Sequence, residues 1–386
     1  MKSEIRIAIV GVGNCAKSLV EGVALYTANP GMSEGLAFHD IGGYKAENIK
    51  FALAYDIDTR KVGRPLAEAI YGKPNCAIDL IDDRAFLDPV IDGACEVKRG
   101  KLLDGVAPHM LNMPEEESFR PTRDPEPSLE EVVRELQENK IDVLLNYLPV
   151  GSEEATRFYV QACLKAKVPF VNCMPVFIVS DPFWEKKLKE AGIPAIGDDM
   201  RSQLGASVLS QALQELFFNR GMQVQFHSQT NHGGNTDFLN MMDQSRLASK
   251  KISKENVIRS QNDLRGIPVP KNGIYAGPSS YIAFHGDNKV AHFRLEATGF
   301  GGAPVVFDAR LSVQDSPNSA GVVIDAIRYV QVAREMGLTG SLRGPSAATQ
   351  KTPPDQMMIQ DAFDECKALA NRELTNSLRA HNLGCS

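Results

Sequence analysis

The stretch Ile5–Ala16, with the sequence IRIAIVGVGNCA, decides the fold. Its first six residues form a short apolar run rich in β-branched side chains, which is typical of a buried parallel strand. Gly11 ends that run, and apolar residues at helical spacing follow from Ala16 to Tyr26. A strand, a glycine turn and a helix in this order predict the opening unit of a dinucleotide-binding fold.

The glycine turn matches the pattern G-x-G-x-x-G/A at Gly11, Gly13 and Ala16. The first glycine permits a tight turn, the second lets backbone amides approach a pyrophosphate, and the small third residue lets the helix pack closely on the strand. The free amides of the helix N-terminus then face the phosphates. We therefore expect Gly11, Gly13, Asn14 and Cys15 to contact a dinucleotide.

An acid at the end of the second strand bears on the choice of dinucleotide. The strand predicted at Ile49–Tyr55 ends in Asp56, where a carboxylate can bind the adenosine ribose hydroxyls. Asp58 is a competing candidate. An acid without an adjacent arginine favours NAD, but Arg60 is close enough to leave NADP open.

Beyond residue 128 the chain alternates helical and strand patterns with short connections. Such units predict a doubly wound parallel sheet with right-handed crossovers. Asn146–Gly151 follows one strand end at a switch-point position, so Asn146 and Pro149 are expected at the nicotinamide ribose. The strands of this part are expected at Ile141–Tyr147, Pro169–Asn172 and Ala195–Gly197.

The pattern changes near residue 222. A helix is expected at Ser319–Met336, after the turn Asp315–Asn318. A chain of 386 residues divides naturally into two domains, so we predict an α/β protein of the Rossmann type, with residues 1–200 completed by 311–386 and an α+β domain inserted at 201–310. Alternation typical of half-exposed antiparallel strands marks Gln223–Gln229, Tyr281–Ala283, His292–Thr298 and Val305–Val313.

Two connections are longer than usual. Residues 27–48 are rich in Gly, Asn and Pro and separate the first helix from the second strand. A loop of this length is more often functional than merely connecting. Residues 72–127 carry many Pro, Asp and Glu residues and are expected to be irregular.

Composition excludes several classes of function. The formal net charge of -6 gives no electrostatic footprint for nucleic acid. The absence of a run of roughly 18 apolar residues argues against a membrane span and favours a cytoplasmic protein. The seven cysteines form no C-x-x-C pair and are expected to be reduced thiols. No metal is assigned to the histidines, which lack ligand spacing: His227, His232, His285 and His292.

Polar residues gather in five segments at predicted strand ends or loops. Their lysines and aspartates suit a phosphorylated, polyhydroxylated substrate that undergoes proton transfers, although lysine runs are more often solvated surfaces. The segments are 197–203 (GDDMRSQ), 231–237 (NHGGNTD), 249–254 (SKKISK), 286–289 (GDNK) and 315–318 (DSPN).

Several longer segments are unrelated to generic nucleotide binding. They are IAIVGVGNCAKSLVEGV from Ile7, LLNYLPVGSEEA from Leu144, FVNCMPVFIVSDP from Phe170, GDDMRSQLGA from Gly197, NHGGNTDFLNM from Asn231, SKKISK from Ser249 and DSPNSAGVVIDA from Asp315. Through these segments the chain resembles the myo-inositol-1-phosphate synthase family, in its shorter bacterial, actinobacterial-like form, over nearly its full length.

The resemblance implies an NAD-dependent conversion of D-glucose 6-phosphate to 1L-myo-inositol 1-phosphate, the first step of inositol biosynthesis. C5 is oxidised, C6 is enolised, C6 attacks C1 in an intramolecular aldol closure, and the C5 ketone is reduced again. The cofactor is thus retained and recycled. The resemblance also implies a catalytic and tetramerisation role for the inserted domain, a homotetramer, and a divalent or monovalent cation of unknown identity.

The family's catalytic lysines fall on Lys250, Lys254, Lys289 and Lys351. The resemblance implies a proton relay at the C5 oxygen for Lys289 and Lys254, and contacts to the phosphate and C1 oxygen for Lys250 and Lys351. It also implies that three aspartates either orient these lysines or contact the cofactor, and that three further residues lie close to the nicotinamide or elsewhere along the cofactor. The aspartates are Asp199, Asp237 and Asp315, and the further residues are Asp198, Ser202 and Ser316.

Two alternatives share the domain plan. A conventional NAD-dependent dehydrogenase, acting on homoserine or a sugar phosphate, would accumulate NADH in proportion to its product. A non-catalytic NAD-sensing protein would bind the cofactor without turnover.

Replacing Lys254 by arginine is expected to abolish turnover, because a guanidinium stays protonated and cannot relay protons. The measurement is the initial rate of inositol phosphate formation from glucose 6-phosphate. Near-normal turnover of Lys254→Arg would show that this position supplies charge alone.

Overall fold

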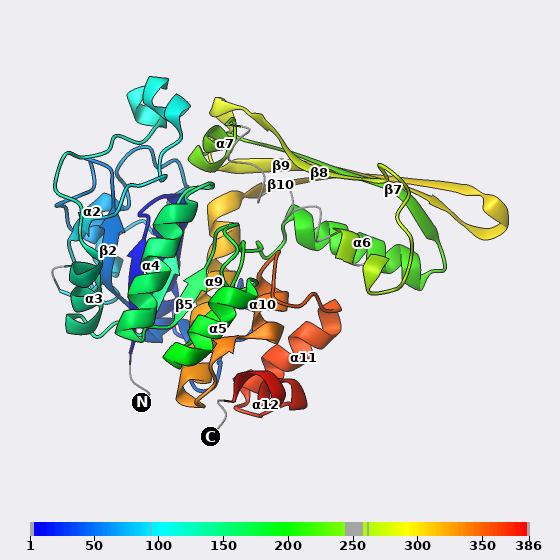
Figure 1. The fold of residues 1–386 in the computed structure, drawn as a ribbon. Helices are drawn as coiled ribbons and strands as arrows, with labels where there is room; N and C mark the ends of the chain where they lie inside the picture. The colour runs from blue at the N-terminus through cyan, green and yellow to red at the C-terminus, as the bar shows by residue number, and fades with distance from the viewer. Residues whose placement is uncertain (1–3, 94, 244–257, 261, 384–386) are drawn as a thin grey trace.

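The computed structural model describes residues 4–93, 95–243, 258–260 and 262–383 (Figure 1). Within these residues a parallel sheet of seven strands has the order β11-β6-β5-β4-β1-β2-β3. None of the helices described there is long and apolar enough to cross a membrane. The strands are β1 Ile5–Val10, β2 Ile49–Asp56, β3 Val97–Arg99, β4 Val143–Asn146, β5 Phe170–Asn172, β6 Pro194–Ile196 and β11 Gly340–Ser341.

Helices cover both faces of this sheet. Alternation along β1 sends Ile7 and Ile9 into a core shared with α1 and α9, and sends Ala8 and Val10 into a second core under α3, α4 and α5. The helices are α1 Asn14–Ala28, α2 Leu66–Ala69, α3 Leu129–Glu138, α4 Glu153–Ala166, α5 Pro182–Ala191, α9 Asp315–Glu335, α10 Arg343–Thr349, α11 Ile359–Ala370 and α12 Asn376–Asn382.

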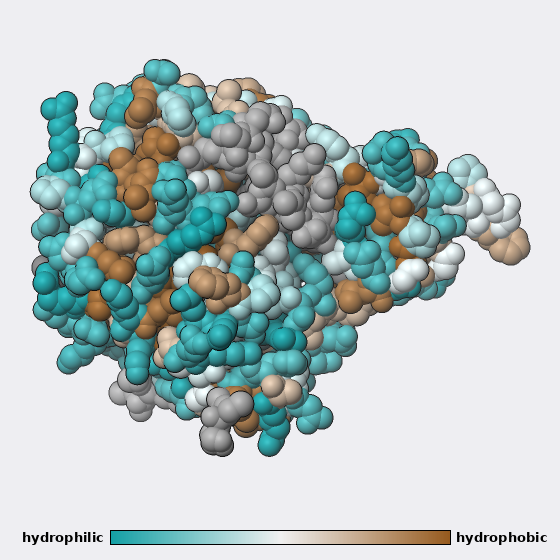
Figure 2. Space-filling model, in the orientation of Figure 1, coloured by the Kyte–Doolittle hydropathy of each residue, from teal (hydrophilic) through white to brown (hydrophobic). Residues whose placement is uncertain are grey.

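A second sheet projects from this body as an arm (Figures 1 and 2). In the described part of the chain it has four strands in the order β10-β9-β7-β8. β9 is antiparallel to both neighbours, whereas β8 is parallel to β7. Its apolar side packs on α6, and α7 lies at its inner end. The elements are α6 Ala206–Asn219, β7 Gln223–Gly233, α7 Thr236–Asn240, β8 Ile274–Tyr281, β9 Asn288–Thr298 and β10 Pro304–Gln314.

The predicted fold class, a Rossmann-type parallel sheet with an inserted α+β part, is confirmed. Two element predictions were wrong. The strand predicted at Tyr281–Ala283 is not there: Tyr281 is the last residue of β8, and Ala283 opens a 3₁₀ turn. The helix predicted from Ser319 begins at Asp315, because Pro317 fits the first helical turn, where backbone amides need no intrahelical partner.

The region 72–127 is largely irregular, as predicted, but it contains the edge strand β3, which the sequence pattern did not indicate. Asp58 and Arg60 hold part of this region in place. Arg60 pairs with the buried Asp58 and donates to the carbonyl of Ser118, and the Arg120 amide donates to the same Asp58 carboxylate.

The insertion 27–48 is held against α9, and its predicted functional role stays a prediction. The buried guanidinium of Arg328 on α9 pairs with Asp325 and donates to the carbonyls of Phe38 and His39 at 2.9 Å. Gly321 permits the close approach, since a Cβ there would lie 2.0 Å from the carbonyl oxygen of Gly35. The structure describes the whole insertion, and none of it lines the cavity described below.

Candidate active site

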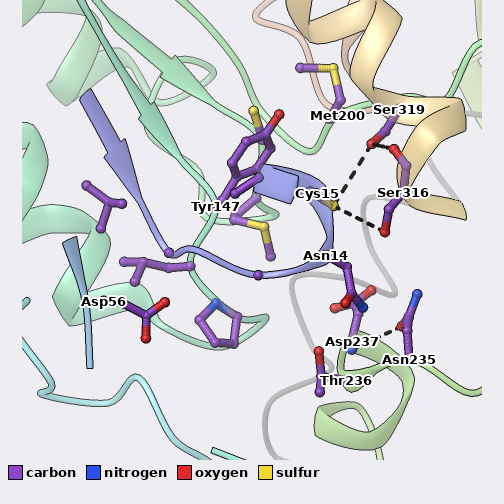
Figure 3. Close-up of a pocket in the computed structure, with 18 of the residues that line it drawn as sticks. Asn14, Cys15, Asp56, Tyr147, Met200, Asn235, Thr236, Asp237, Ser316 and Ser319 are labelled. Atoms are coloured by element: carbon purple, nitrogen blue, oxygen red, sulfur yellow. Dashed lines mark hydrogen bonds between the residues drawn. The ribbon is translucent and has the colours of Figure 1, made fainter. Parts of the chain in front are cut away.

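An open cavity lies at the carboxyl ends of the central parallel strands (Figure 3). Segments far apart in the sequence meet there: the glycine turn, the ends of β2 and β4, the loop after β6, α7, β9 and the start of α9. The predicted site residues that line it are Gly11, Gly13, Asn14, Cys15, Asp56, Pro149, Asp199, Ser202, Asp237, Lys289, Asp315, Ser316 and Lys351.

The glycine turn has the geometry of a pyrophosphate cradle. Gly11 has a φ of 95°, and a Cβ there would lie 2.5 Å from the carbonyl oxygen of Tyr147. Gly13 caps α1 without a side-chain hydrogen bond, and a Cβ on Gly13 would meet no described atom within 4 Å. The first amides of α1 therefore open onto the cavity, where a phosphate can accept their hydrogen bonds.

Asp56 is fixed at the edge of the cavity. Its Oδ2 accepts the Val12 amide at 2.7 Å, and its Oδ1 accepts the amides of Ile57 and Asp58 at 2.7 and 2.8 Å. An ionised carboxylate has about four acceptor positions, so it can still accept a ribose hydroxyl. The competing Asp58 is buried against Arg60 and is not among the lining residues.

Asn146 and Asp198 lie behind the cavity wall rather than on it. Both are fully buried, and Asn172 joins them: its Oδ1 accepts from Asn146 at 2.9 Å, and its Nδ2 donates to Asp198 at 2.7 Å. Asp198 also accepts the amides of Ile178, Val179 and Ser180. Burial raises the pKa of Asp198 to about 6, against the opposing effect of its donors. This network fixes the strand ends beneath the site.

Two lysine–aspartate pairs face the cavity. Lys289 Nζ on β9 lies 2.7 Å from Asp315 Oδ1 at the start of α9. Lys351 Nζ, beyond α10, lies 2.7 Å from Asp199 Oδ1 and donates to the Met200 carbonyl at 2.8 Å. Each pair places an ammonium donor beside a carboxylate acceptor, the groups that proton transfer requires. The predicted Lys250 and Lys254 lie outside the described residues.

Asp199 has an unusual backbone conformation. It is buried and has a φ of 64°. Its amide donates to the Met174 carbonyl at 3.0 Å, and its carbonyl accepts the Lys351 amide at 2.7 Å. A left-handed aspartate is uncommon, and such strain gathers at functional sites. The surrounding hydrogen bonds hold its carboxylate against Lys351.

Asp287 is a supporting residue that the sequence did not single out. Its buried carboxylate accepts the Ser316 amide at 3.0 Å, the Ser316 hydroxyl at 2.8 Å and the Asn235 side chain at 3.1 Å. Burial raises the pKa of Asp287 to about 6, and nearby Asp315 adds to the rise. The sequence feature that could have indicated Asp287 is its position in the GDNK segment, two residues before Lys289.

Cys15 is a neutral part of the wall. Burial, and then Asp287 and Asp315, raise the pKa of its thiol to about 12. A protonated thiol is a poor nucleophile, so this site does not favour cysteine chemistry. No group of three or more His, Cys, Asp or Glu side chains in the described part of the chain could hold a metal ion.

The fold and the cavity together are those of an enzyme and are consistent with a dinucleotide cofactor of the NAD type. The comparisons narrow this class. The family model for myo-inositol-1-phosphate synthase matches residues 205–316. The inositol-3-phosphate synthase of Mycolicibacterium smegmatis is 44% identical, over 92% of this chain and 94% of that protein. The Corynebacterium glutamicum inositol-3-phosphate synthase is 43% identical, over 95% and 98%.

A solved structure shows the same fold. Inositol-3-phosphate synthase from Caenorhabditis elegans matches with a TM-score of 0.73 and 15% identity, over 98% of this chain and 88% of that one. The chain belongs to the myo-inositol-1-phosphate synthase family. The predicted resemblance is thereby confirmed.

Replacing Asp199 by asparagine is expected to keep the fold but lower turnover by about 100-fold or more, because asparagine also adopts the left-handed conformation while the proton acceptor is lost. Thermal unfolding and kcat measure the two effects. Asp181→Asn is the control, since Asp181 caps α5 and asparagine caps equally well. Near-normal turnover of Asp199→Asn would contradict a role for this carboxylate.

Proposed function

We propose that this protein isomerises D-glucose 6-phosphate to 1L-myo-inositol 1-phosphate, with NAD retained through oxidation at C5, enolisation, aldol closure and reduction at C5. The observation that carries the proposal is that both lysine–aspartate pairs line the same cavity as the glycine turn. Such an arrangement suits a sugar whose oxygens gain charge beside a dinucleotide.

NAD fits the residues that are present. The glycine turn and the start of α1 would hold the pyrophosphate, and Asp56 the adenosine ribose. NAD is favoured over NADP because Asp56 would repel a 2′-phosphate and Arg60 is engaged with Asp58. Bound there, NAD would accept a hydride from the sugar and return it. The remaining contacts are proposed for Cys15, Pro149, Ser202 and Ser316.

The start of α6 suits the phosphate of the substrate. A smaller cavity beside the first is lined by Gly205–Val208, together with Asp237, Lys289 and Lys351. Gly205 caps α6 without a side-chain hydrogen bond, and the first turn carries no acidic residue. Free amides and a nearby ammonium together favour an anion. We therefore assign the phosphate to this helix end and to Lys351, with Lys250 as a further contact.

The lysines would stabilise the charges that develop on the sugar. At oxidation, Lys289 would pass a proton to Asp315 and, with Lys254, take the proton that the C5 hydroxyl loses. At reduction the same groups would return a proton to the C5 oxygen. Lys351 would donate to the C1 oxygen as C6 attacks, held in place by Asp199. Asp237 lines both cavities and would orient the sugar between them.

The same proposal divides the chain as the sequence predicted. Residues 1–200 with 311–386 would bind the cofactor, and residues 201–310 would supply catalytic groups and join subunits into a homotetramer. The sheet face opposite α6 supports the latter role. It exposes about half of Phe226, Tyr275 and Val306, which lie on β7, β8 and β10.

The reaction is tested by its redox balance. Glucose 6-phosphate with substoichiometric NAD should yield many equivalents of inositol phosphate without lasting NADH absorbance, because each hydride returns to the sugar. Product identity by NMR and the NADH absorbance are the two measurements. Accumulation of NADH in proportion to product would instead identify a conventional dehydrogenase, and NAD binding without turnover would identify a sensor.

A charged substitution tests whether the sheet face opposite α6 joins subunits. Val306→Glu would bury carboxylates between subunits and should shift the protein from a tetramer to smaller species in light scattering. Leu216→Glu, at an exposed position on α6, is the control and should leave the assembly unchanged. An intact tetramer of Val306→Glu would exclude this face.

A further inference from the structure

Tyr147 carries a hydroxyl group that forms no hydrogen bond with any of the described residues. The residue directly follows β4 and lines the cavity. This hydroxyl is shielded from solvent. Tyr44, Tyr55 and Tyr159 have partners: Glu335, Glu135 and the Lys101 amide.

A buried hydroxyl without a partner is costly to the fold. Phenylalanine would fill nearly the same space without that cost, because a buried polar group that forms no hydrogen bond has lost its hydrogen bonds to water and gained none in exchange. Burial holds the pKa of Tyr147 well above its usual range, so the phenol stays neutral and can both donate and accept. The hydroxyl therefore points to a polar group of a ligand.

The surroundings of Tyr147 define the shape of that ligand. Sulfur-containing side chains share this part of the wall, namely Cys15, Cys173, Met174 and Met200. Sulfur forms only weak hydrogen bonds but contacts aromatic rings favourably. In Figure 3, Met200 and Ser316 lie on the other side of the glycine turn from Asp56, which marks the adenosine end. This part of the cavity suits a flat ring with one polar substituent.

We propose that the Tyr147 hydroxyl hydrogen-bonds the carboxamide of the nicotinamide ring. Tyr147 is then a cofactor-contact residue, and its backbone and side chain serve one site. Its carbonyl oxygen lies against Gly11, where a Cβ would approach to 2.5 Å, and its ring reaches past the turn to the sulfur-lined wall. The proposal rests on the proposed function, in which this cavity holds NAD.

The test compares two ligands on Tyr147→Phe by isothermal titration. NAD carries the carboxamide, whereas ADP-ribose lacks the nicotinamide ring and keeps everything else. The variant should bind NAD about fivefold to tenfold more weakly, the loss expected for one buried hydrogen bond, and ADP-ribose as tightly as the wild type. Without ligand its midpoint of thermal unfolding should be unchanged or higher, since the unpaired hydroxyl is gone.

Tyr44→Phe is the matched control. It removes a hydroxyl bonded to Glu335, away from the cavity, and should lower thermal stability without changing either affinity. Unchanged NAD affinity of Tyr147→Phe, or equal loss for both ligands, would overturn the assignment of Tyr147. A wild-type protein that binds neither ligand would instead refute the cofactor site itself.

Discussion

The ion pair between Lys289 and Asp315 is the contact on which the site depends. Lys289 belongs to the projecting sheet, and Asp315 opens α9, which packs against α1 on the parallel sheet. The pair is mostly shielded from solvent, so salt screens it less than a surface pair. It sits where the chain passes from β10 back into the first domain. The same contact therefore ties the projecting sheet to α9 and holds the Lys289 ammonium at the cavity, where the proposed proton relay requires it.

A second constraint holds the cofactor side of the cavity. Both backbone groups of Val12 are hydrogen-bonded: its amide donates to Asp56, and its carbonyl accepts from the buried Lys61. Burial lowers the pKa of Lys61, while the nearby Asp56 and Asp58 oppose that shift. The glycine turn is thus fixed before any ligand arrives, which reduces the entropy lost on binding.

The sequence predicted the parts of the site that local pattern determines. The turn at Gly11 needs a strand before it and a helix after it, and both are local signals. Asp56 was predicted as a site residue because it is an acid at the end of the next strand. The roles of Lys289, Lys351 and their aspartates needed the family resemblance, because a lysine has no local pattern that separates a site from a surface.

The sequence could not predict what depends on the packing of distant segments. Asn146 ends β4 and Asp198 lies two residues after β6, yet their side chains turn into a buried network that Asn172 completes. Nothing in the sequence of residues 27–48 indicates that Arg328, nearly 300 residues away, donates hydrogen bonds to their backbone. Gly277 and Pro278 interrupt the alternation of β8, so that strand was misplaced.

The central claim is that one NAD stays bound while the sugar is oxidised, closed and reduced. Glucose 6-phosphate deuterated at C5, incubated with unlabelled NAD and NADH in excess, tests it directly by mass spectrometry of both product and cofactor. The account predicts that the deuterium remains on the ring of the inositol phosphate and does not enter the free cofactor pool. Deuterium in free NADH, with unlabelled product, would contradict it.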